Sequence, residues 1–404
     1  MRFLFLTQYY PPEIGAPQTR LKSMGIELVK LGHQVEVVTA LPNHPTGRIF
    51  PNYKGKFYVK ENIDEITIHR VWLYAASGAG FKRIINYLSF VVTCLFGLFR
   101  CQKPDYIFVE SPPLFLSIPA YIMSLIWKRP FIFNVADLWP DSVRDLNIIR
   151  NRFVLRAAEH LELWTYRKAQ FITVVTEGIK ERLEAKGVQE QKILYLPNGV
   201  DINLFKLQSP KNDLINELGI ENKTVFLYAG THGYAQGLEI ILEAAKKVKN
   251  ENVLFLFIGD GPIKHKLIKN KNDNNLKNVL FLEPQPLRRM PEFFSISYAS
   301  LVTLKDIELF KGARPSKIFP SLSSAVPVIY SGAGEGAQLI EEAKAGIVVT
   351  PENSDLLAEA IICLSKNPDL AKELGVNGRK FVEEKLSWTS LITNWLKQLE
   401  GKGK

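Results

Sequence analysis

Two positively charged side chains, Arg314 and Lys317, flank Pro315 and Ser316 in the segment 312–349. Proline is favoured at the first position of a helix, so Pro315 predicts a helix N-terminus beside both cations. Free backbone N–H groups and the helix dipole favour an anion at such an end. The segment therefore predicts a phosphate-binding site, although solvated surface charges would also explain Arg314 and Lys317.

A second candidate anion site follows one strand later. The apolar run Val326–Tyr330 predicts a buried parallel strand, and the amphipathic run Ala337–Ala343 predicts a helix. The turn between them contains Gly334, Glu335 and Gly336. A glycine-rich turn in this position can present backbone N–H groups to a phosphate. Each motif alone is weak, but two of them one strand apart favour phosphate binding.

Two further glycine-rich turns follow the predicted strands 224–229 and 253–258. The carboxyl ends of parallel strands meet at one edge of a sheet, so we expect these turns to form one pocket for a nucleotide diphosphate. The dinucleotide-binding fingerprint and the Walker lysine motif are both missing from the sequence. The residues expected to line the pocket are Gly230, Thr231, His232, Gln236, Gly259, Asp260 and Gly261.

Loops of the first half also carry candidate residues. The predicted strand 2–7 leads to a loop with Gly15 and Ala16, where the missing side chain of Gly15 would let a ligand approach the backbone. The predicted strand 34–40 leads to a loop with His44. His44 is a candidate acceptor contact or acid–base group, and a histidine that only stabilises its loop explains the sequence equally well.

A third loop of the first half follows the predicted strand 131–136 and contains Asp137, Trp139 and Asp141. Carboxylates beside an aromatic ring suit the hydroxyl groups and the ring face of a sugar. The simpler interpretation is an aspartate that caps the next helix, and both roles are compatible.

The chain has 404 residues, more than one hydrophobic core normally serves, so two domains are expected. Strands and helices alternate in both halves. This predicts two doubly wound α/β domains, 1–205 and 206–385, and a C-terminal helix in 386–404 that packs toward the first domain. The formal net charge of +10 favours anionic partners, but no nucleic-acid-binding signature is present. Three cysteines form no disulfide framework, so we expect reduced thiols and a cytoplasmic protein.

Two apolar segments, 81–100 and 112–127, are too short or too interrupted by proline to span a bilayer. Buried helices would explain their composition. Alternatively, the basic residues at their ends would meet anionic headgroups while apolar side chains enter the membrane interface. The sequence therefore predicts no transmembrane segment and leaves open a peripheral position on the inner face of the cytoplasmic membrane.

Together these motifs resemble the GT-B glycosyltransferases, in particular the retaining family four and its branch similar to bacterial surface-polysaccharide N-acetylfucosamine transferases. The resemblance covers nearly the whole chain in family order and rests on the stretches QYYPPEIGAPQTR, LPNHPTGRIFPNY, VADLWPDS, LPNGVD, YAGTHGYAQGL, IGDGP, ARPSKIF and VPVIYSG. It implies two Rossmann-like domains facing across a cleft, with the nucleotide bound by the second. It also implies a nucleotide-sugar donor, expected to be UDP-linked, and a polyprenyl-diphosphate-linked saccharide as acceptor.

The resemblance further implies roles for the candidate residues. Arg314 and Lys317 would neutralise the leaving diphosphate, so neither a metal nor a further cofactor would be needed. In a front-face substitution the leaving phosphate helps to deprotonate the acceptor, while His44 and Asp137 would orient the acceptor or assist proton transfer. The other candidates would bind the donor: Gly15, Ala16, Gly230, Thr231, His232, Gln236, Gly259, Asp260, Gly261, Ser316, Gly334, Glu335 and Gly336.

The sequence departs from the family pattern at three places. Gly312 and Pro320 replace two glutamates that are common in the family. His232 and Gln236 replace the usual Arg and Lys after the first strand of the second domain, and Ala136 replaces a histidine.

The missing glutamates leave contacts to the donor hydroxyls to Glu335, Glu308 or backbone groups. The expected function is sugar transfer in the biosynthesis of a surface polysaccharide such as O-antigen or capsule. Two alternatives remain: a sugar-nucleotide 2-epimerase of similar fold, and a non-catalytic partner subunit. Product analysis would distinguish the first alternative, and donor turnover by the isolated protein would test the second.

Overall fold

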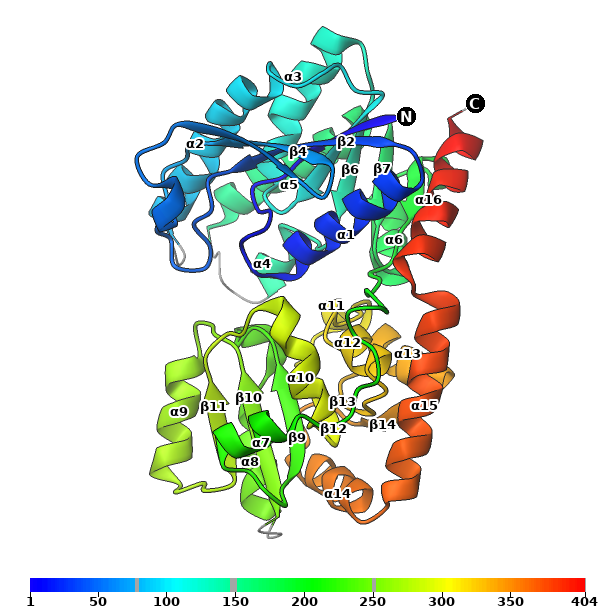
Figure 1. The fold of residues 1–404 in the computed structure, drawn as a ribbon. Coiled ribbons are helices and arrows are strands. Elements are labelled where there is room, and N and C mark those ends of the chain that lie inside the picture. Colours follow the sequence, from blue (N-terminus) through cyan, green and yellow to red (C-terminus); the bar gives the residue numbers. More distant parts are fainter. Residues whose placement is uncertain (77–79, 146–150, 249–251, 404) are drawn as a thin grey trace. The chain divides into compact units, whose positions relative to one another are not determined.

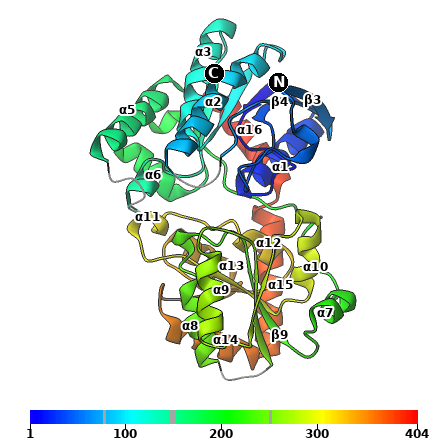
Figure 2. The ribbon, with the colours of Figure 1, turned by 90° about the vertical axis from the view of Figure 1, so that its left-hand side faces the viewer.

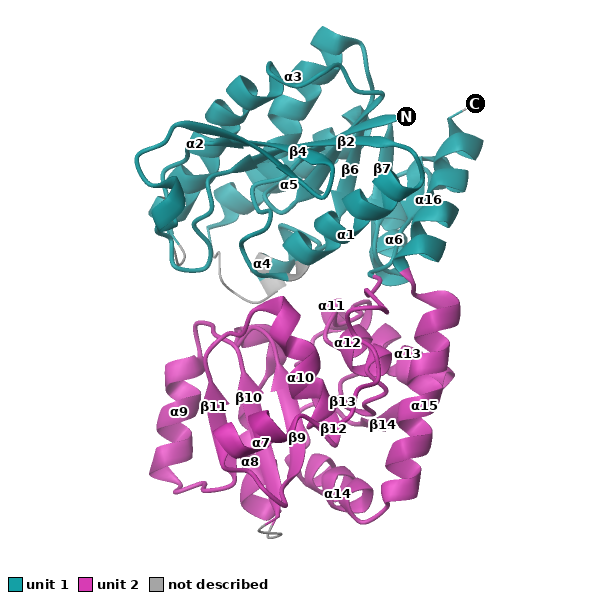
Figure 3. Ribbon diagram, in the orientation of Figure 1, with its two compact units in different colours: residues 1–198, 388–404 teal, residues 199–387 magenta. Residues whose placement is uncertain are grey.

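The computed structural model describes residues 1–76, 80–145, 151–248 and 252–403. The chain forms two compact units (Figures 1 and 3). Unit 1 comprises residues 1–198 and 388–404, and unit 2 comprises residues 199–387. Both units contain a mainly parallel sheet with helices, which confirms the predicted α/β class.

Unit 1 contains an eight-stranded sheet of order β3-β4-β2-β1-β5-β6-β7-β8. All neighbouring strands are parallel except β3, which runs antiparallel to β4 at one edge. The polar, largely accessible β3 has no buried face, and the sequence pattern did not reveal it. The strands are β1 (Arg2–Leu6), β2 (Gln34–Ala40), β3 (Tyr58–Ile63), β4 (Ile66–Val71), β5 (Tyr106–Ser111), β6 (Phe131–Val135), β7 (Phe171–Val174) and β8 (Ile193–Tyr195).

Helices cover both faces of this sheet. Its α-helices are α1 (Ala16–Lys30), α2 (Phe81–Leu98), α3 (Ser117–Trp127), α4 (Asp141–Asp145), α5 (Arg152–Lys168), α6 (Glu177–Ala185) and α16 (Trp388–Lys402). The C-terminal helix α16 packs beside α1, and its Trp395 is fully buried against Phe3 and Phe108. The helix α16 therefore completes the hydrophobic core of unit 1, although it follows unit 2 in the sequence. None of the helices in the described part of the chain is both long and apolar enough to cross a bilayer.

Unit 2 contains a six-stranded parallel sheet of order β11-β10-β9-β12-β13-β14. The strands are β9 (Thr224–Ala229), β10 (Val253–Ile258), β11 (Val279–Leu282), β12 (Ala299–Thr303), β13 (Val328–Ser331) and β14 (Gly346–Val349). Every residue of β10 is buried, as expected for a strand covered on both faces.

The helices of unit 2 form two layers (Figure 2). One hydrophobic cluster joins the sheet to α8 (Glu239–Lys247), α9 (Lys264–Asp273) and α14 (Ser354–Ser365). The other joins it to α7 (Asn212–Leu218), α10 (Met290–Ser295), α12 (Ile318–Ser323), α13 (Glu335–Ala343) and α15 (Pro368–Lys385). The short α11 (Glu308–Lys311) precedes α12.

One predicted helix start was wrong. Pro315 does not open α12, because residues 316 and 317 form a turn and the helix begins at Ile318. Lys317 is the N-cap, and the Ile318 N–H donates to the Pro315 carbonyl oxygen at 3.1 Å. The charged residues therefore lie on the turn that leads into the helix, which has only six residues.

Candidate functional site

Two glycine-rich turns of unit 2 pack directly on each other at the carboxyl ends of β9 and β10. The Gly230 N–H donates to the Ile258 carbonyl oxygen at 2.9 Å, and the His232 N–H donates to the Asp260 carbonyl oxygen at 2.8 Å. Gly259 has φ +144°, and a Cβ there would overlap the Gly230 carbonyl oxygen. Only glycine permits this backbone approach, so the structure brings the two predicted turns together.

Lys317 lies across the first of these turns. A Cβ on Gly230 would overlap Lys317 Cε, and Lys317 Nζ lies 5.5 Å from the centre of the Tyr228 ring. The side chain is partly buried, and this burial lowers the pKa of Lys317 to about 8. A partly desolvated ammonium group beside backbone turns is suited to binding a phosphate, because the negative charge would compensate for the lost hydration.

Arg314 lies at the second candidate anion site. Its Nε is 2.9 Å from Glu335 Oε2, so the two side chains form an ion pair, although their orientation is not that of a hydrogen bond. Glu335 is the first residue of α13, and Gly334 caps this helix with φ +72°. A Cβ on Gly334 would overlap the Lys311 carbonyl oxygen. The structure thus joins Arg314 to the glycine turn, but Glu335 already offsets its charge.

Tyr330 lies beneath the same turn. Its ring is fully buried, and a Cβ on Gly336 would approach its Oη to 2.5 Å. Tyr330 Oη has no hydrogen-bond partner among the described residues. A buried hydroxyl group without a hydrogen-bond partner destabilises the folded state. Tyr330 therefore places a polar group that is free to bind a ligand beneath the glycines of this turn.

His232 differs from the other candidates in its burial. Its imidazole is fully buried, with ring centres 5.7 Å from Tyr228, 6.1 Å from Phe257 and 6.0 Å from Phe281. Neither ring nitrogen has a hydrogen-bond partner within the described parts of the chain. Burial, together with the nearby positive charge of Lys264, lowers the pKa of His232 to about 4. The backbone of His232 therefore belongs to the turn, while its neutral side chain packs among the aromatic rings of the core beneath the turn.

This burial predicts acid sensitivity of unit 2. An unfolded histidine has its pKa near 6.5, so between pH 6.5 and 4 the unfolded state binds a proton that the folded state does not. The contribution of neutral His232 to the free energy of unfolding is then fully present above pH 6.5 and is lost as the pH falls. The loss amounts to about 2 kcal/mol between pH 7 and 5. His232→Phe should remove this loss. All six tryptophans lie in unit 1, so the measurement is hydrogen exchange of the β9 and β10 amides at both pH values. An equal acid loss in the variant would contradict the prediction.

In unit 1 a buried carboxylate connects two of the candidate loops. Glu13 Oε1 accepts the backbone N–H groups of Asn43 and His44, each at 2.8 Å, and Oε2 accepts the N–H of Tyr10 at 3.3 Å. Burial raises the pKa of Glu13 to about 7. Glu13 thereby fixes the Gly15 loop against the His44 loop, and it is a residue that motif analysis had not selected.

A continuous group of partly exposed aromatic rings borders the same sheet edge. Tyr9 lies 5.4 Å from the His44 ring centre, and the guanidinium of Arg83 stacks over both Tyr9 and Tyr87. The series continues through Phe115 to Trp139, with ring centres 6.4 Å and 6.1 Å apart. We call these six residues, His44, Tyr9, Arg83, Tyr87, Phe115 and Trp139, the aromatic band.

The two aspartates near Trp139 have different surroundings. Asp141 is buried and pairs with Lys186 at 2.9 Å and Arg144 at 3.1 Å, so it has a structural role. Asp137 accepts a long hydrogen bond from Ser142 Oγ at 3.4 Å and another from the backbone N–H of Leu138. Desolvation raises the pKa of Asp137, and the hydrogen bonds from Ser142 and Leu138 act against this rise.

The comparisons with known proteins address both units. Residues 15–199 match the family model described as glycosyl transferase 4-like domain, and residues 210–381 match the model described as glycosyl transferases group 1. The chain is a glycosyltransferase. Its two units have the GT-B fold, which solved glycosyltransferase structures share.

Two curated relatives and one solved structure illustrate the similarity. The putative colanic acid biosynthesis glycosyl transferase WcaI of Escherichia coli is 25% identical, covering 99% of this chain and 100% of the relative. The capsular polysaccharide biosynthesis glycosyltransferase CapM of Staphylococcus aureus is 24% identical, covering 76% of this chain and 80% of the relative. The structure of Anabaena Alr3699/HepE in complex with UDP and glucose has a TM-score of 0.74 at 18% identity, covering 98% and 99% of the two chains.

Within each unit of this glycosyltransferase, the structure groups most of the predicted residues. In unit 2, Lys317 joins the Gly230 and Gly259 turns, and Arg314 joins the Gly334 turn. In unit 1, His44 and Asp137 follow β2 and β6, which are separated by β1 and β5. Three strand spacings amount to about 14 Å, so the ends of these two strands lie at separate positions along the same edge of the sheet.

Proposed function

We propose that this glycosyltransferase transfers a sugar, with retention of configuration and without a metal, from a UDP-linked donor to a lipid-linked or polysaccharide acceptor. The proposed sugar is an N-acetylated deoxyamino sugar, as in the N-acetylfucosamine transferases. The proposed process is surface-polysaccharide biosynthesis, because WcaI and CapM carry the names of colanic acid and capsular polysaccharide enzymes. The observation that carries the proposal is Lys317 lying across Gly230, between β9 and the start of α12.

The donor site is proposed to centre on that contact. A diphosphate placed over the Gly230 turn would meet the Lys317 ammonium, and charge on the leaving group is what sugar transfer must stabilise. Ser316 lies two residues after Arg314, and Arg314 pairs with Glu335 of the Gly334 turn, so Ser316 and this turn would complete the phosphate contacts. The HepE structure holds UDP, which supports a uridine nucleotide for this chain as well.

The aromatic band is proposed to bind the acceptor. Aromatic faces stack on sugar rings, and Arg83 adds a cation that suits a diphosphate linking a saccharide to a lipid. Its guanidinium donates to Tyr9 Oη and, at 3.0 Å, to Tyr87 Oη, so it is held in place before any ligand arrives. Asp137 lies two residues before Trp139 of this band, and its exposed carboxylate would accept hydrogen bonds from sugar hydroxyl groups.

Nucleotide binding gives the first test. A ligand that binds only the folded state must raise the melting temperature, so UDP at 100 times its Kd should add about 2.7 kcal/mol to the stability of unit 2. We expect stabilisation by UDP in the presence of a chelator, and a smaller effect of UMP because it lacks the second phosphate. Products formed from UDP-sugars with a lipid-linked acceptor then identify transfer. Release of an altered UDP-sugar without an acceptor would indicate an epimerase instead.

A peripheral membrane contact is proposed for unit 1. The exposed side chains Ile84, Leu88 and Val92 recur every four residues and form one stripe along α2. On α3, which packs beside α2, Ile122, Leu125 and Ile126 are likewise exposed. Exposed lysines lie at the start of α2 (Lys82) and the end of α3 (Lys128). Apolar stripes bordered by cations favour an anionic lipid surface.

This contact predicts binding to anionic vesicles. Replacing both Leu88 and Val92 with aspartate should weaken binding to phosphatidylglycerol vesicles at least about tenfold, because each change removes apolar burial and adds repulsion. Val376→Asp is the matched control, since Val376 is 54% exposed on α15 of unit 2. Vesicle flotation measures the effect. Equal flotation of the double variant and the control would argue against the contact.

A further inference from the structure

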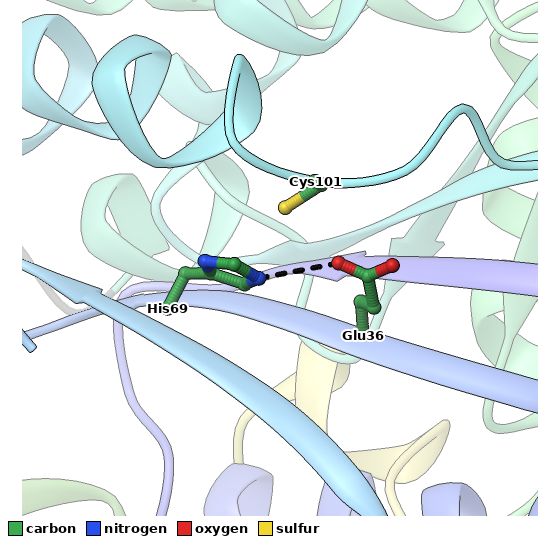
Figure 4. Close-up of side chains that lie close together, drawn as sticks. All are labelled: Glu36, His69 and Cys101. Carbon is green, nitrogen blue, oxygen red and sulfur yellow. Dashed lines mark hydrogen bonds and ion pairs between the residues drawn. The ribbon is translucent and has the colours of Figure 1, made fainter. Parts of the chain in front are cut away.

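A cluster of three potential metal ligands lies in unit 1, apart from the loops described above. Glu36 comes from β2, His69 from β4 and Cys101 from the connection after α2 (Figure 4). One ligand atom from each residue lies within 4.8 Å of the others. Figure 4 shows the Cys101 sulfur facing the hydrogen-bonded pair of His69 and Glu36. None of these residues takes part in the proposed sugar transfer.

The sheet register explains why these side chains meet. His69 pairs with Val38, two residues after Glu36, so His69 and Glu36 point to the same face of the sheet. His69 Nε2 lies 3.2 Å from Glu36 Oε2, and His69 Nδ1 lies 2.9 Å from Tyr58 Oη. The Gln102 N–H donates to Glu36 Oε1 at 3.3 Å, which holds the Cys101 connection over the pair.

A nucleophilic role for Cys101 does not fit this arrangement. The Cys101 thiol donates to the Gly97 carbonyl oxygen at 3.3 Å, so its proton is not held by a general base. Both nitrogens of His69 also face oxygen atoms of other residues, so the ring is not free to act as a base for the thiol.

The geometry points to a zinc site in which Cys101 Sγ, His69 Nε2 and Glu36 Oε2 bind one Zn²⁺ ion. Ligand distances of about 2.0 Å for nitrogen and oxygen and 2.3 Å for sulfur place tetrahedral ligand atoms about 3.3 to 3.7 Å apart. The His69–Glu36 distance of 3.2 Å already agrees with this spacing. Cys101 lies on a connection outside any helix or strand and would need to move inward by about 1 Å.

The donor set favours zinc over other cations. One thiolate, one imidazole and one carboxylate match the soft and intermediate ligands of Zn²⁺, whereas Mg²⁺ and Ca²⁺ select oxygen atoms. The negative charges of the thiolate and the carboxylate offset the charge of the Zn²⁺ ion, while the imidazole binds in its neutral form. The protons displaced from the ligands pass to solvent. Tyr58 Oη would accept the Nδ1–H of His69 and fix its tautomer, as an outer-shell partner does.

The position of the cluster suggests a structural function. It joins β2 and β4 to the C-terminal end of α2, where a Cβ on Gly97 would lie 3.0 Å from Val38 and 3.2 Å from Val71. A bound ion would fasten the end of α2 to the sheet. Since α2 also carries Arg83 and the exposed apolar stripe, the ion would stabilise the helix that presents both.

The test is metal binding by the reduced full-length protein. Cys363→Ser serves as the background, because Cys363 is exposed in unit 2, and Cys94 is fully buried inside α2. We expect this protein to bind one Zn²⁺ in competition with a chromophoric chelator. Co²⁺ should give the ultraviolet charge-transfer band of a thiolate ligand. Adding Cys101→Ala should abolish the band and weaken Zn²⁺ binding more than about 100-fold, because loss of an outer-shell partner alone costs 10- to 100-fold.

A second variant separates coordination from folding. Tyr58→Phe removes only the outer-shell hydroxyl group and should weaken Zn²⁺ binding about 10- to 100-fold while keeping the thiolate band. Fluorescence of the six tryptophans, all of which lie in unit 1, provides an independent check that each variant is folded. Equal Zn²⁺ affinities with and without Cys101, or no binding of Zn²⁺ or Co²⁺ to the background protein, would overturn the proposal.

Discussion

Lys317→Ala is expected to lower kcat/KM for sugar transfer by about 100- to 1,000-fold, the range found when one group that stabilises developing negative charge is removed. The side chain lies over Gly230 and near the Tyr228 ring, and it forms no ion pair within the described part of the chain. Removing it should therefore affect the leaving diphosphate much more than stability. The measurement is initial rates with UDP-sugar, together with the melting temperature of the free protein. Unchanged turnover in a folded variant would remove Lys317 from the mechanism.

The pKa of Lys317 adds a pH dependence that can be separated from folding. Because this pKa is about 8, UDP binding above pH 8 must first restore a proton to the amine, so affinity should fall up to about tenfold per pH unit. Lys317→Arg is the matched control, since an arginine stays charged throughout this range. Its UDP affinity should be flat from pH 7 to 9.5. A parallel fall in both proteins would assign the effect to another group.

Gly259→Ala is expected to abolish UDP binding and to destabilise unit 2 by more than about 3 kcal/mol. Two costs combine at this position: φ of +144° disfavours any Cβ, and the Cβ would overlap the Gly230 carbonyl oxygen. Because the new Cβ is fixed to the backbone and the Gly230 carbonyl oxygen is itself a backbone atom, no side chain can move to relieve the overlap. The two turns would therefore have to separate. UDP titration and hydrogen exchange of the β9 and β10 amides measure the two effects.

Gly219→Ala isolates the backbone term. Gly219 ends α7 in the same unit with φ +62°, and no atom lies within 4 Å of a Cβ there. This variant should lose about 1–2 kcal/mol of the free energy of unfolding of unit 2 and keep full UDP affinity. If both variants lost the same stability and both still bound UDP, close packing of the two turns would not be required for the site.

Most of the fold could be predicted because its signals are local. Alternating apolar strands and helices, each closed by a glycine or polar turn, determine a parallel sheet whose loops meet at one edge. The turns at Gly230, Gly259 and Gly334 were found because glycine marks backbone that comes close to another group. The edge strand β3 was missed, since a strand without a buried face has no alternating pattern.

The sequence by itself determined the two α/β halves, the glycine turns and the cations near them, because each depends on neighbours along the chain. Only the tertiary structure decided which of these groups meet. It placed Lys317 over Gly230, paired Arg314 with Glu335, and buried His232 beneath its own turn. The aromatic band and the cluster of Glu36, His69 and Cys101 likewise unite elements distant in sequence. Contacts of this kind follow from sheet order and helix packing, which no local pattern encodes.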